Sequence, residues 1–287
     1  MTAAWHDPRI VRGMQAQLRN RRELLAAGHK ALGWKLAFGG PAAMERLRIN
    51  APLVGFLLES AKLLSGSTVF VSNWTKPAAE PEIAVYLGKD LPANSTRETA
   101  IAAISALGPA IELADVDHPS DDVEGTLACN IYQRHIILGC ADSAFAGGLL
   151  DGLACRVVRN GSEIANAADP QSLQALTGEL IDIVRHTANL LAAFGESLQA
   201  GQLIIAGSIT PPLWVAPGEE LLFHLAPIDS ISIRFGPYEK AGIAFVRPRR
   251  PKLLKSSATK SRPSSTKACS FGLPRLPSIA VCSPLPR

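Results

Sequence analysis

With 287 residues, of which 47% are hydrophobic and 19% charged, the chain has the composition of an ordinary globular protein, slightly poor in charge. No apolar run approaches the roughly 20 residues that a membrane helix needs, and the start, MTAAWHDPRI, lacks the basic and then apolar order of a signal peptide. Five cysteines without a CxxC pair argue against a disulfide framework or a zinc site, so we expect a cytoplasmic protein.

The net charge of +4 is unevenly distributed along the chain. Ten of the 29 basic residues, and none of the 25 acidic ones, lie in residues 247–287. The other 19 basic residues leave residues 1–246 with a net charge of about −6. A basic, partner-binding character therefore belongs to the C-terminal segment alone.

The first 66 residues are predicted to form an N-terminal helical or cap region, residues 1–66. Asp7 followed by Pro8 is typical of a helix start. Apolar residues then recur at helical spacing up to Leu32, which predicts one or two amphipathic helices. Glycines and prolines interrupt residues 33–65, where we expect only a short helix over residues 42–47.

Residues 67–246 are predicted to form a β-rich domain. Asn160-Gly161 predicts a two-residue hairpin turn, and one long helix is expected between Asp169 and Gly195. Eight short segments that are rich in Val and Ile and bounded by turn residues predict strands: STVFVS, EIAVYLG, AIELADV, RHIILGC, ACRVVRNGSEIA, QLIIAGSIT, ELLFHL and SISIRFG.

The last segment, residues 247–287, is rich in Pro, Ser, Lys and Arg and shows no hydrophobic period. Such a composition buries too little apolar surface to offset the entropy lost on ordering, so we expect a disordered tail. A basic arm that contacts nucleic acid is the functional alternative, although the segment lacks interleaved aromatic residues. A shifted reading frame at the end of the gene is a third interpretation.

Two glutamates lie two positions apart in AEPEIAVYLG, an otherwise apolar strand segment. Because side chains alternate in a strand, Glu80 and Glu82 point to the same face, with Cα atoms ~6.6 Å apart. Two ionised carboxylates on one buried face repel each other unless a cation lies between them. Ala78 and Ala84 flank the pair on that face and leave space above it.

A third glutamate occupies the same kind of place in GPAIELADVD. Glu112 shares its strand face with Ala110 and Ala114, so this carboxylate also has room around it. Three oxygen ligands with no His or Cys nearby suit Mg²⁺ or Mn²⁺. Glutamates at alternate positions are also typical of the solvated face of an antiparallel sheet, and spacing alone leaves both interpretations open.

Six segments, in this order, resemble the fumarylacetoacetate hydrolase superfamily, in its branch of 2-keto-4-pentenoate hydratases and 4-oxalocrotonate decarboxylases. They are GWKLAF, APLVGFLLES, AEPEIAVYLGKDL, GPAIELADVD, GQLIIAGSIT and SISIRF, and the resemblance covers roughly residues 30–236. A glutamate pair followed some thirty residues later by a third glutamate is the metal signature of this branch. Residues 247–287 have no counterpart in it.

The resemblance implies an α+β fold, a mixed β-roll with an N-terminal helical region and one long outer helix, with residues 67–246 as the catalytic domain. It implies that Glu80, Glu82 and Glu112 hold Mg²⁺ or Mn²⁺, which a 2-oxo acid chelates through its carboxylate and 2-oxo oxygens. Lys35 in GWKLAF matches the active-site lysine of the family. Glu59 in GFLLES stands where the family usually has an aspartate, and both residues are expected to transfer protons.

Two further residues are expected to contact the substrate. The family's segment of an asparagine followed by small residues corresponds here to CNIYQRH, in which Asn130 is retained. Ile131, Tyr132 and Gln133 replace the small residues, which changes the surroundings of the substrate. Thr210 in AGSITPP offers a hydroxyl for the substrate carboxylate, although a threonine at a strand end is also typical of a cap.

The function implied by the resemblance is a metal-dependent hydratase of 2-hydroxy-dienoate or 2-oxo-alkenoate acids, as in meta-cleavage catabolism of aromatic compounds. A decarboxylase of a vinylogous 2-oxo diacid is the alternative, with Arg134 as the candidate to hold the distal carboxylate. An acylpyruvate hydrolase is disfavoured, because neither His6 nor His29 belongs to a recognisable His–Glu pair. A poorly active partner subunit is a further alternative, suggested by the altered CNIYQRH segment.

The expected partners follow from the same resemblance. The substrate is expected to be a small 2-oxo acid. Members of the superfamily usually self-associate, so we expect a homo-oligomer or a complex with a related decarboxylase or hydratase. Neither membrane association nor nucleic-acid binding by the body of the chain is expected.

Overall fold

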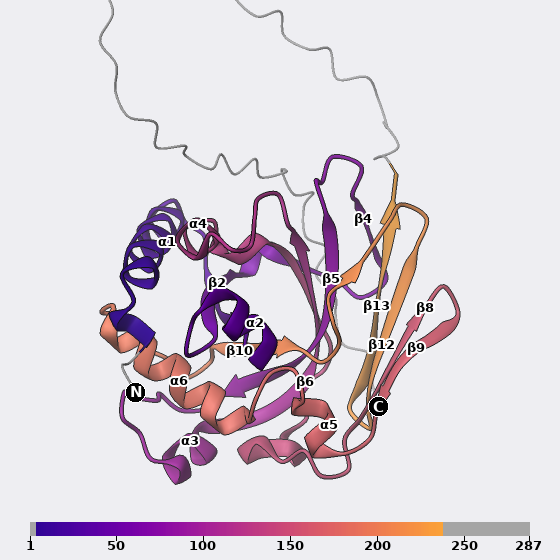
Figure 1. Cartoon of the computed structure of the whole chain (residues 1–287). Helices are drawn as coiled ribbons and strands as arrows, with labels where there is room; N and C mark the ends of the chain where they lie inside the picture. Colours follow the sequence, from indigo (N-terminus) through magenta and orange to yellow (C-terminus); the bar gives the residue numbers. More distant parts are fainter. Residues whose placement is uncertain (1–3, 238–287) are drawn as a thin grey trace, which may run out of the picture. The chain divides into compact units, whose positions relative to one another are not determined.

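Two β-sheets, with helices packed outside the larger one, make up the part of the chain that the structure describes (Figure 1). The structure is a computed structural model that describes residues 4–237. The larger sheet contains, in spatial order, β2 (Leu53–Leu58), β1 (Ala31–Ala37), β10 (Leu203–Ser208), β5 (Pro77–Leu87), β6 (Ile104–Asp115), β7 (Gln133–Leu138) and β3 (Lys62–Leu63), with β11 (Leu213–Trp214) beside β5.

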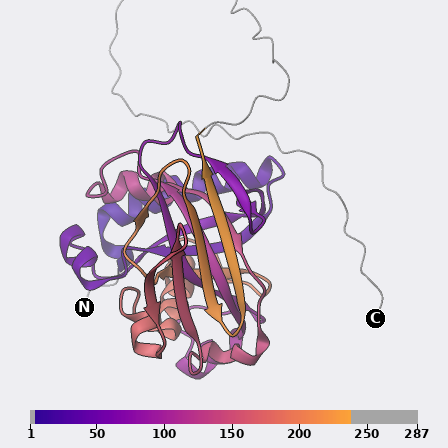
Figure 2. The same ribbon diagram turned by 90° about the vertical axis from the view of Figure 1, so that its right-hand side faces the viewer.

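The smaller sheet faces the viewer in Figure 2. It contains, in spatial order, β4 (Ser67–Phe70), β13 (Asp229–Gly236), β12 (Glu220–Ala226), β8 (Ala154–Arg159) and β9 (Ser162–Ala167). The α-helices are α1 (Pro8–Ala26), α2 (Pro41–Leu47), α3 (Arg97–Ala103), α4 (Val123–Ala128), α5 (Pro170–Gln174) and α6 (Leu180–Ala193). Short 3₁₀ helices are η1 (Ala4–His6), η2 (Glu59–Ala61), η3 (Asn130–Tyr132) and η4 (Ser143–Gly148).

The two faces of strand β6 meet different surroundings: one face packs in the apolar core between the two sheets, and the other carries Glu112. Its Ile111 and Leu113 are fully buried, and β12 and β13 of the smaller sheet pack against this strand. Because side chains alternate along a strand, Ala110, Glu112 and Ala114 point the other way. The predicted alternation in GPAIELADVD therefore places apolar side chains on one face of β6 and the charged Glu112 on the other.

The α+β class and all eight strand segments predicted from residue 67 onward are confirmed. The Asn160-Gly161 hairpin is also present, with φ of 50° and 80° at its two residues, as this turn requires. The short helix expected over residues 42–47 is α2. The predicted tail, residues 247–287, lies outside the described residues.

Two predictions for the N-terminal 66 residues were wrong. The helix ends at Ala26 rather than Leu32, and residues 33–65 contain β1 and β2, which join the larger sheet rather than forming a loose segment. Both strands are buried almost throughout, so they lack the alternation that marks a half-exposed strand. A boundary at residue 66 would cut through this sheet.

The predicted long helix is divided into α5 and α6. Gly178 adopts φ of 95°, which ends regular helix in the middle of the apolar stripe. Glu179 then starts α6 by accepting the Asp182 backbone N–H, and Gln174 accepts the Leu180 N–H. The interruption exposes Leu176 and Thr177 to the cavity described below.

Among residues 4–237, no helix is both long and apolar enough to cross a membrane.

Replacing Gly33 by alanine tests the close approach of β1 and β10. A Cβ atom at Gly33 would lie 1.9 Å from the Leu203 backbone oxygen, which the strand pairing holds in place. We expect Gly33→Ala to lower the free energy of unfolding by about 3 kcal/mol or more in urea denaturation. Gly28→Ala, where a Cβ meets nothing within 4 Å and only φ of +97° is unfavourable, should cost about 1–2 kcal/mol. Equal losses in the two variants would contradict the steric explanation.

Candidate metal centre

Strands β5 and β6 bring the three predicted metal ligands together. Glu80 and Glu112 are direct partners in the antiparallel ladder, and Glu82 lies two positions further along the same face of β5. One carboxylate oxygen from each residue lies within 4.8 Å of the other two. Glu82 and Glu112 are 1% and 0% exposed, which excludes the solvated-face interpretation for them.

Burial raises the pKa of each of the three carboxyl groups. Loss of hydration raises the pKa of Glu112 to about 7, although the Lys35 ammonium acts in the opposite direction. Burial also raises the pKa of Glu82 well above its usual range, and repulsion from Glu112 and Glu80 adds to this. The pKa of Glu80 is raised by burial as well. The cluster is therefore a place where a cation would be strongly stabilising.

Lys35 of β1 is the basic side chain within this cluster. It is 1% exposed, its Nζ forms an ion pair with Glu112 Oε1, and it donates to the Ile131 backbone oxygen at 2.9 Å. The side chain fits because its neighbour on β2 is Gly55, where a Cβ would lie 2.9 Å from Lys35 Cγ. One ammonium opposite three carboxylates leaves the ionised cluster with a net charge of −2.

A backbone donor fixes the orientation of one carboxylate. Gly207 lies at a register irregularity between β10 and β5, with φ of +97°. Its N–H therefore leaves the ladder and donates to Glu82 Oε2 at 2.7 Å. Hydrogen bonds of this kind hold ligand side chains in place at metal sites.

The donor set fits a hard divalent cation. Oε2 of Glu112 is buried and has no hydrogen-bond partner among the described residues. Such an orphaned oxygen is costly unless it binds something that the chain itself does not supply. Carboxylate oxygens are the ligands that Mg²⁺, Mn²⁺ and Ca²⁺ prefer. Glu80, Glu82 and Glu112 could therefore hold such an ion.

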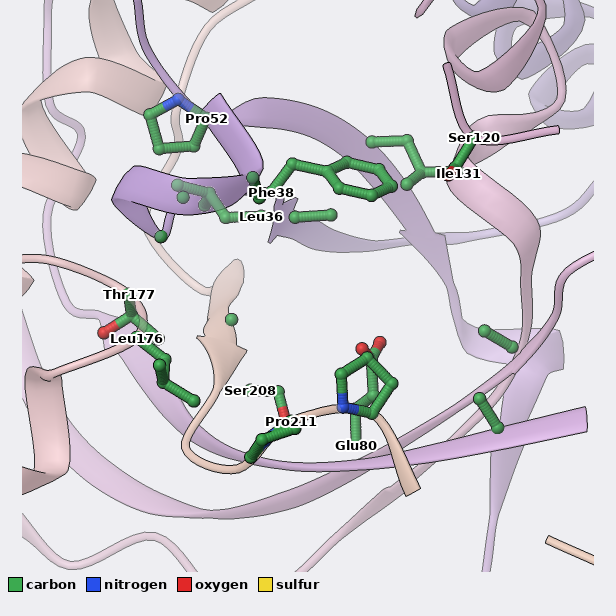
Figure 3. Close-up of a pocket in the computed structure, with 18 of the residues that line it drawn as sticks. Leu36, Phe38, Pro52, Glu80, Ser120, Ile131, Leu176, Thr177, Ser208 and Pro211 are labelled. Atoms are coloured by element: carbon green, nitrogen blue, oxygen red, sulfur yellow. The ribbon is translucent and has the colours of Figure 1, made fainter. Parts of the chain in front are cut away.

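A cavity of about 530 Å³ opens beside this cluster, a size typical of small-molecule sites. Figure 3 shows the Glu80 carboxylate pointing into it from one side, while Phe38 and Ile131 face it from the other. The wall is mostly apolar. The polar or charged side chains that line it are those of Lys35, Arg46, Lys76, Glu80, Ser120, Tyr132, Thr177, Ser208 and Thr210.

Two glycines let one wall of the cavity close tightly. A Cβ at Gly39 would lie 2.9 Å from the Thr177 backbone oxygen, and one at Gly40 would lie 3.0 Å from that of Leu176. The segment before α2 therefore contacts the α5–α6 connection through backbone atoms. Thr210, predicted to contact the substrate, lines the cavity and is 5% exposed.

The structure corrects the prediction that Glu59 acts at this site. Pro52, just before β2, lines the cavity, whereas Glu59 follows the other end of that strand. Gly55 pairs with Lys35, and four extended residues further on correspond to ~13 Å. Glu59 is half-buried, pairs with Lys62 at 2.9 Å between Oε2 and Nζ, and does not line the cavity.

Asn130 and Arg134 also differ from their predicted roles. Asn130 does not line the cavity, because both ends of its amide bond the Phe56 backbone: Oδ1 accepts from N at 2.8 Å and Nδ2 donates to O at 2.9 Å. The predicted direct contact with the substrate is therefore wrong. Arg134 pairs with Asp117 at 3.0 Å and Asp115 at 3.5 Å and does not line the cavity.

Several lining residues were not found in the sequence. The Phe38 side chain points into the cavity (Figure 3). The backbone of Phe38 is left-handed, with φ of 58°, and no pattern in the sequence predicts this conformation. Leu176 and Thr177 reach it because the predicted helix breaks, and the glycine in LTGEL was the available signal. Lys76 lines the mouth with its Nζ 3.9 Å from the centre of the Trp214 ring.

The raised pKa of Glu112 predicts a pH dependence of stability when EDTA removes divalent ions. Between about pH 4.5, the ordinary value, and about 7, the folded protein keeps a proton that the unfolded chain releases. The free energy of unfolding should therefore fall as the pH rises through this window.

Thermal unfolding in EDTA across this window measures the effect. Glu112→Gln should flatten the dependence, whereas Glu163→Gln, on an exposed part of β9, should leave it unchanged. Excess Mg²⁺ or Mn²⁺ should raise the melting temperature more at pH 7 than at pH 5, because the ion binds ionised carboxylates. A stability that rises with pH in EDTA would contradict this reading of the cluster.

Comparisons with known proteins agree with the geometry. The family model of the fumarylacetoacetate (FAA) hydrolase C-terminal domain matches residues 19–239. The chain is 27% identical over 215 residues to 2-hydroxyhexa-2,4-dienoate hydratase of Comamonas testosteroni, covering 73% of this chain and 80% of that protein. It is 28% identical over 225 residues to 4-oxalocrotonate decarboxylase of Pseudomonas putida, covering 77% and 83%.

A solved structure also resembles this fold. That of 4-oxalocrotonate decarboxylase from Pseudomonas putida G7, complexed with magnesium and adipate, matches with a TM-score of 0.71 at 27% identity. The match covers 82% of this chain and 90% of that one. Both relatives named above are lyases, and the resemblance drawn from the sequence motifs is confirmed. The chain belongs to the fumarylacetoacetate hydrolase family.

Proposed function

We propose that the protein is a metal-dependent lyase that acts as a hydratase of 2-hydroxy-dienoate or 2-oxo-alkenoate acids. The observation that carries this proposal is the convergence of Glu80, Glu82 and Glu112 beside a cavity with mostly apolar walls. The relatives support it, since hydratases and decarboxylases of such acids are among them. The product of hydration would be a 4-hydroxy-2-oxo acid.

Mg²⁺ or Mn²⁺ is the ion that we propose for the three carboxylates. When bound, the ion supplies a Lewis acid for the 2-oxo group and for the negative charge that develops on its enolate. The oxygen-only donor set and the unpartnered Glu112 Oε2 support this choice. Thr210 lines the cavity, and its Oγ1 donates to the Pro211 backbone oxygen at 3.0 Å. We propose that this O–H turns to the substrate carboxylate when the substrate binds.

The remaining chemistry falls to side chains that line the cavity. We assign proton transfer at the substrate carbon chain to Lys35, since Glu59 is out of reach and Lys35 is buried beside the carboxylates. The apolar residues Leu36, Phe38 and Ile131 would hold the hydrocarbon part of the substrate and limit the access of water. The apolar walls beside the carboxylate cluster favour a substrate with a polar reacting end and an apolar chain.

A decarboxylase of a 2-oxo diacid is the second candidate, and two cations at the cavity favour it. Arg46 and Lys76 line the cavity, are exposed, and have no carboxylate partner among the described residues. Either could bind a distal carboxylate, the role that the sequence prediction gave to Arg134. We also propose a cytoplasmic location and self-association, as in the sequence prediction.

Proton exchange tests whether the site is catalytic. With Mg²⁺ or Mn²⁺, the protein should exchange the C3 protons of a 2-oxo acid for deuterium, followed by NMR, because enolisation is common to both candidate reactions. EDTA or Glu82→Gln should reduce the exchange about 100-fold or more, and Glu163→Gln should not change it. Exchange no faster than with the metal salt alone would sink the proposal and favour a non-catalytic subunit.

A substrate panel separates the two candidates. Short 2-hydroxy-dienoates should be hydrated with higher kcat/KM than their dicarboxylate analogues if the protein is a hydratase. Evolution of CO₂ from the diacids would instead favour the decarboxylase. In that case Lys76→Gln should raise KM for the diacid about 10-fold, by removing a charged contact, while Lys89→Gln, an exposed lysine outside the cavity wall, should have no effect.

A further inference from the structure

Three consecutive residues beside the carboxylate cluster adopt the left-handed conformation. The φ angles of Asn130, Ile131 and Tyr132 are 53°, 51° and 62°. This region is uncommon for any residue other than glycine, and a β-branched residue such as isoleucine is a genuine outlier in it. Such backbone strain persists only where the surroundings hold it in place, and it is concentrated at functional sites.

The Asn130 side chain is what holds this turn. Among residues 4–237, strand β2 lies at the edge of the larger sheet and pairs with β1 alone, so its outward backbone groups need another partner. The Asn130 amide accepts from the Phe56 N–H at 2.8 Å and donates to the Phe56 carbonyl at 2.9 Å, as a neighbouring strand would. Gly55 provides the space, since a Cβ there would lie 3.0 Å from Asn130 Oδ1.

The far end of the turn is fixed as well. The Tyr132 hydroxyl lies 3.1 Å from Thr126 Oγ1 and donates to the His118 backbone oxygen at 3.2 Å. Asn130 and Tyr132 are 2% and 5% exposed. With both ends anchored, the peptide between them has one orientation, and the carbonyl of Ile131 accepts from Lys35 Nζ at 2.9 Å.

This carbonyl restricts the Lys35 ammonium. A lysine ammonium has three N–H donors. One pairs with Glu112 Oε1 and a second with the Ile131 oxygen, so the tetrahedral geometry of the nitrogen sets the direction of the third. Lys35 lines the cavity, and the third donor is the one left for a molecule bound there.

We propose that Asn130 is a positioning residue that, through the strained turn and the Ile131 carbonyl, fixes the direction in which the Lys35 ammonium presents its third proton. The conclusion rests on the proposed function in so far as Lys35 acts on a substrate. Asn130 itself does not line the cavity, and its two amide hydrogen bonds go to Phe56 rather than to a carboxylate. The rate of the chemical step should therefore depend on it more than substrate binding does.

Gln17 provides a matched control for a merely structural role. It is 0% exposed and, like Asn130, uses a buried side-chain amide to bond the backbone of β2, donating to the Val54 oxygen at 3.2 Å. Its second acceptor is the Leu127 oxygen at 3.0 Å, so neither of these hydrogen bonds involves the turn or Lys35. Gln17→Ala removes a comparable buried amide without disturbing the ammonium.

The experiment compares Asn130→Gly, Asn130→Ala and Gln17→Ala in the full chain with Mg²⁺. Glycine accepts the left-handed conformation, so Asn130→Gly removes the amide without adding strain and remains testable if Asn130→Ala does not fold. The first readout is kcat and KM for hydration of a short 2-hydroxy-dienoate. The second is the ¹H–¹⁵N signal of the Lys35 ammonium, which is assigned by its loss in Lys35→Met. At neutral pH such a signal is visible when hydrogen bonds and burial slow proton exchange with water, so wild type and variants are compared at the same pH and temperature.

We expect both Asn130 variants to lose the ammonium signal and to lower kcat about 10- to 100-fold, the range for residues that orient an active group, with KM within about 3-fold of wild type. Gln17→Ala should keep the signal and kcat even if it melts earlier. Retention of the signal and kcat in Asn130→Gly, or equal losses in Gln17→Ala, would overturn the proposal. If wild type shows the signal but no turnover, the proposed function fails, while loss of the signal in Asn130→Gly still supports the positioning of Lys35.

Discussion

Three carboxylates lie on one face of two adjacent strands, those of Glu82 and Glu112 fully buried and that of Glu80 half-buried, and this is the constraint on which the rest of the structure depends. Removing an ionised carboxylate from water is costly unless a counter-charge or hydrogen bonds replace the water. Here one ammonium, Lys35, and one backbone N–H, that of Gly207, offset part of that cost. The small residues Ala110 and Gly55 leave space around the cluster instead of filling it. The cluster therefore lowers the stability of the fold, which is typical of a functional site.

The shared face of Glu80 and Glu82 could be predicted because the alternation of side chains along a strand is local, while the addition of Glu112 to the set came from the family resemblance. Glu80 and Glu82 share a face in any regular strand, whereas the pairing of Glu80 with Glu112 depends on a register that spacing does not determine. Glu59 was misplaced for the same kind of reason. Which end of β2 meets the cavity depends on its direction relative to β1, a long-range property that no local pattern carries.

Other features escaped prediction because their causes lie far away in the chain. Strands β1 and β2 were read as loose because they are buried on both faces and contain glycines. Gly33 is a glycine because the Leu203 backbone leaves no room for a Cβ, not because the chain turns there. Asn130 was expected to meet the substrate, but its amide is taken by Phe56, 74 residues earlier.

The contact between the segment before α2 and the α5–α6 connection restricts how this cavity can diversify. Gly39 and Gly40 meet the Leu176 and Thr177 carbonyls through backbone atoms, so side chains cannot grow there without pushing the wall apart. Changes in the size of the accepted molecule must then arise elsewhere on the wall, for example at Ile131. Duplicated genes that encode this fold would thus acquire new substrate preferences through changes in the other wall, while Gly39 and Gly40 stay constant.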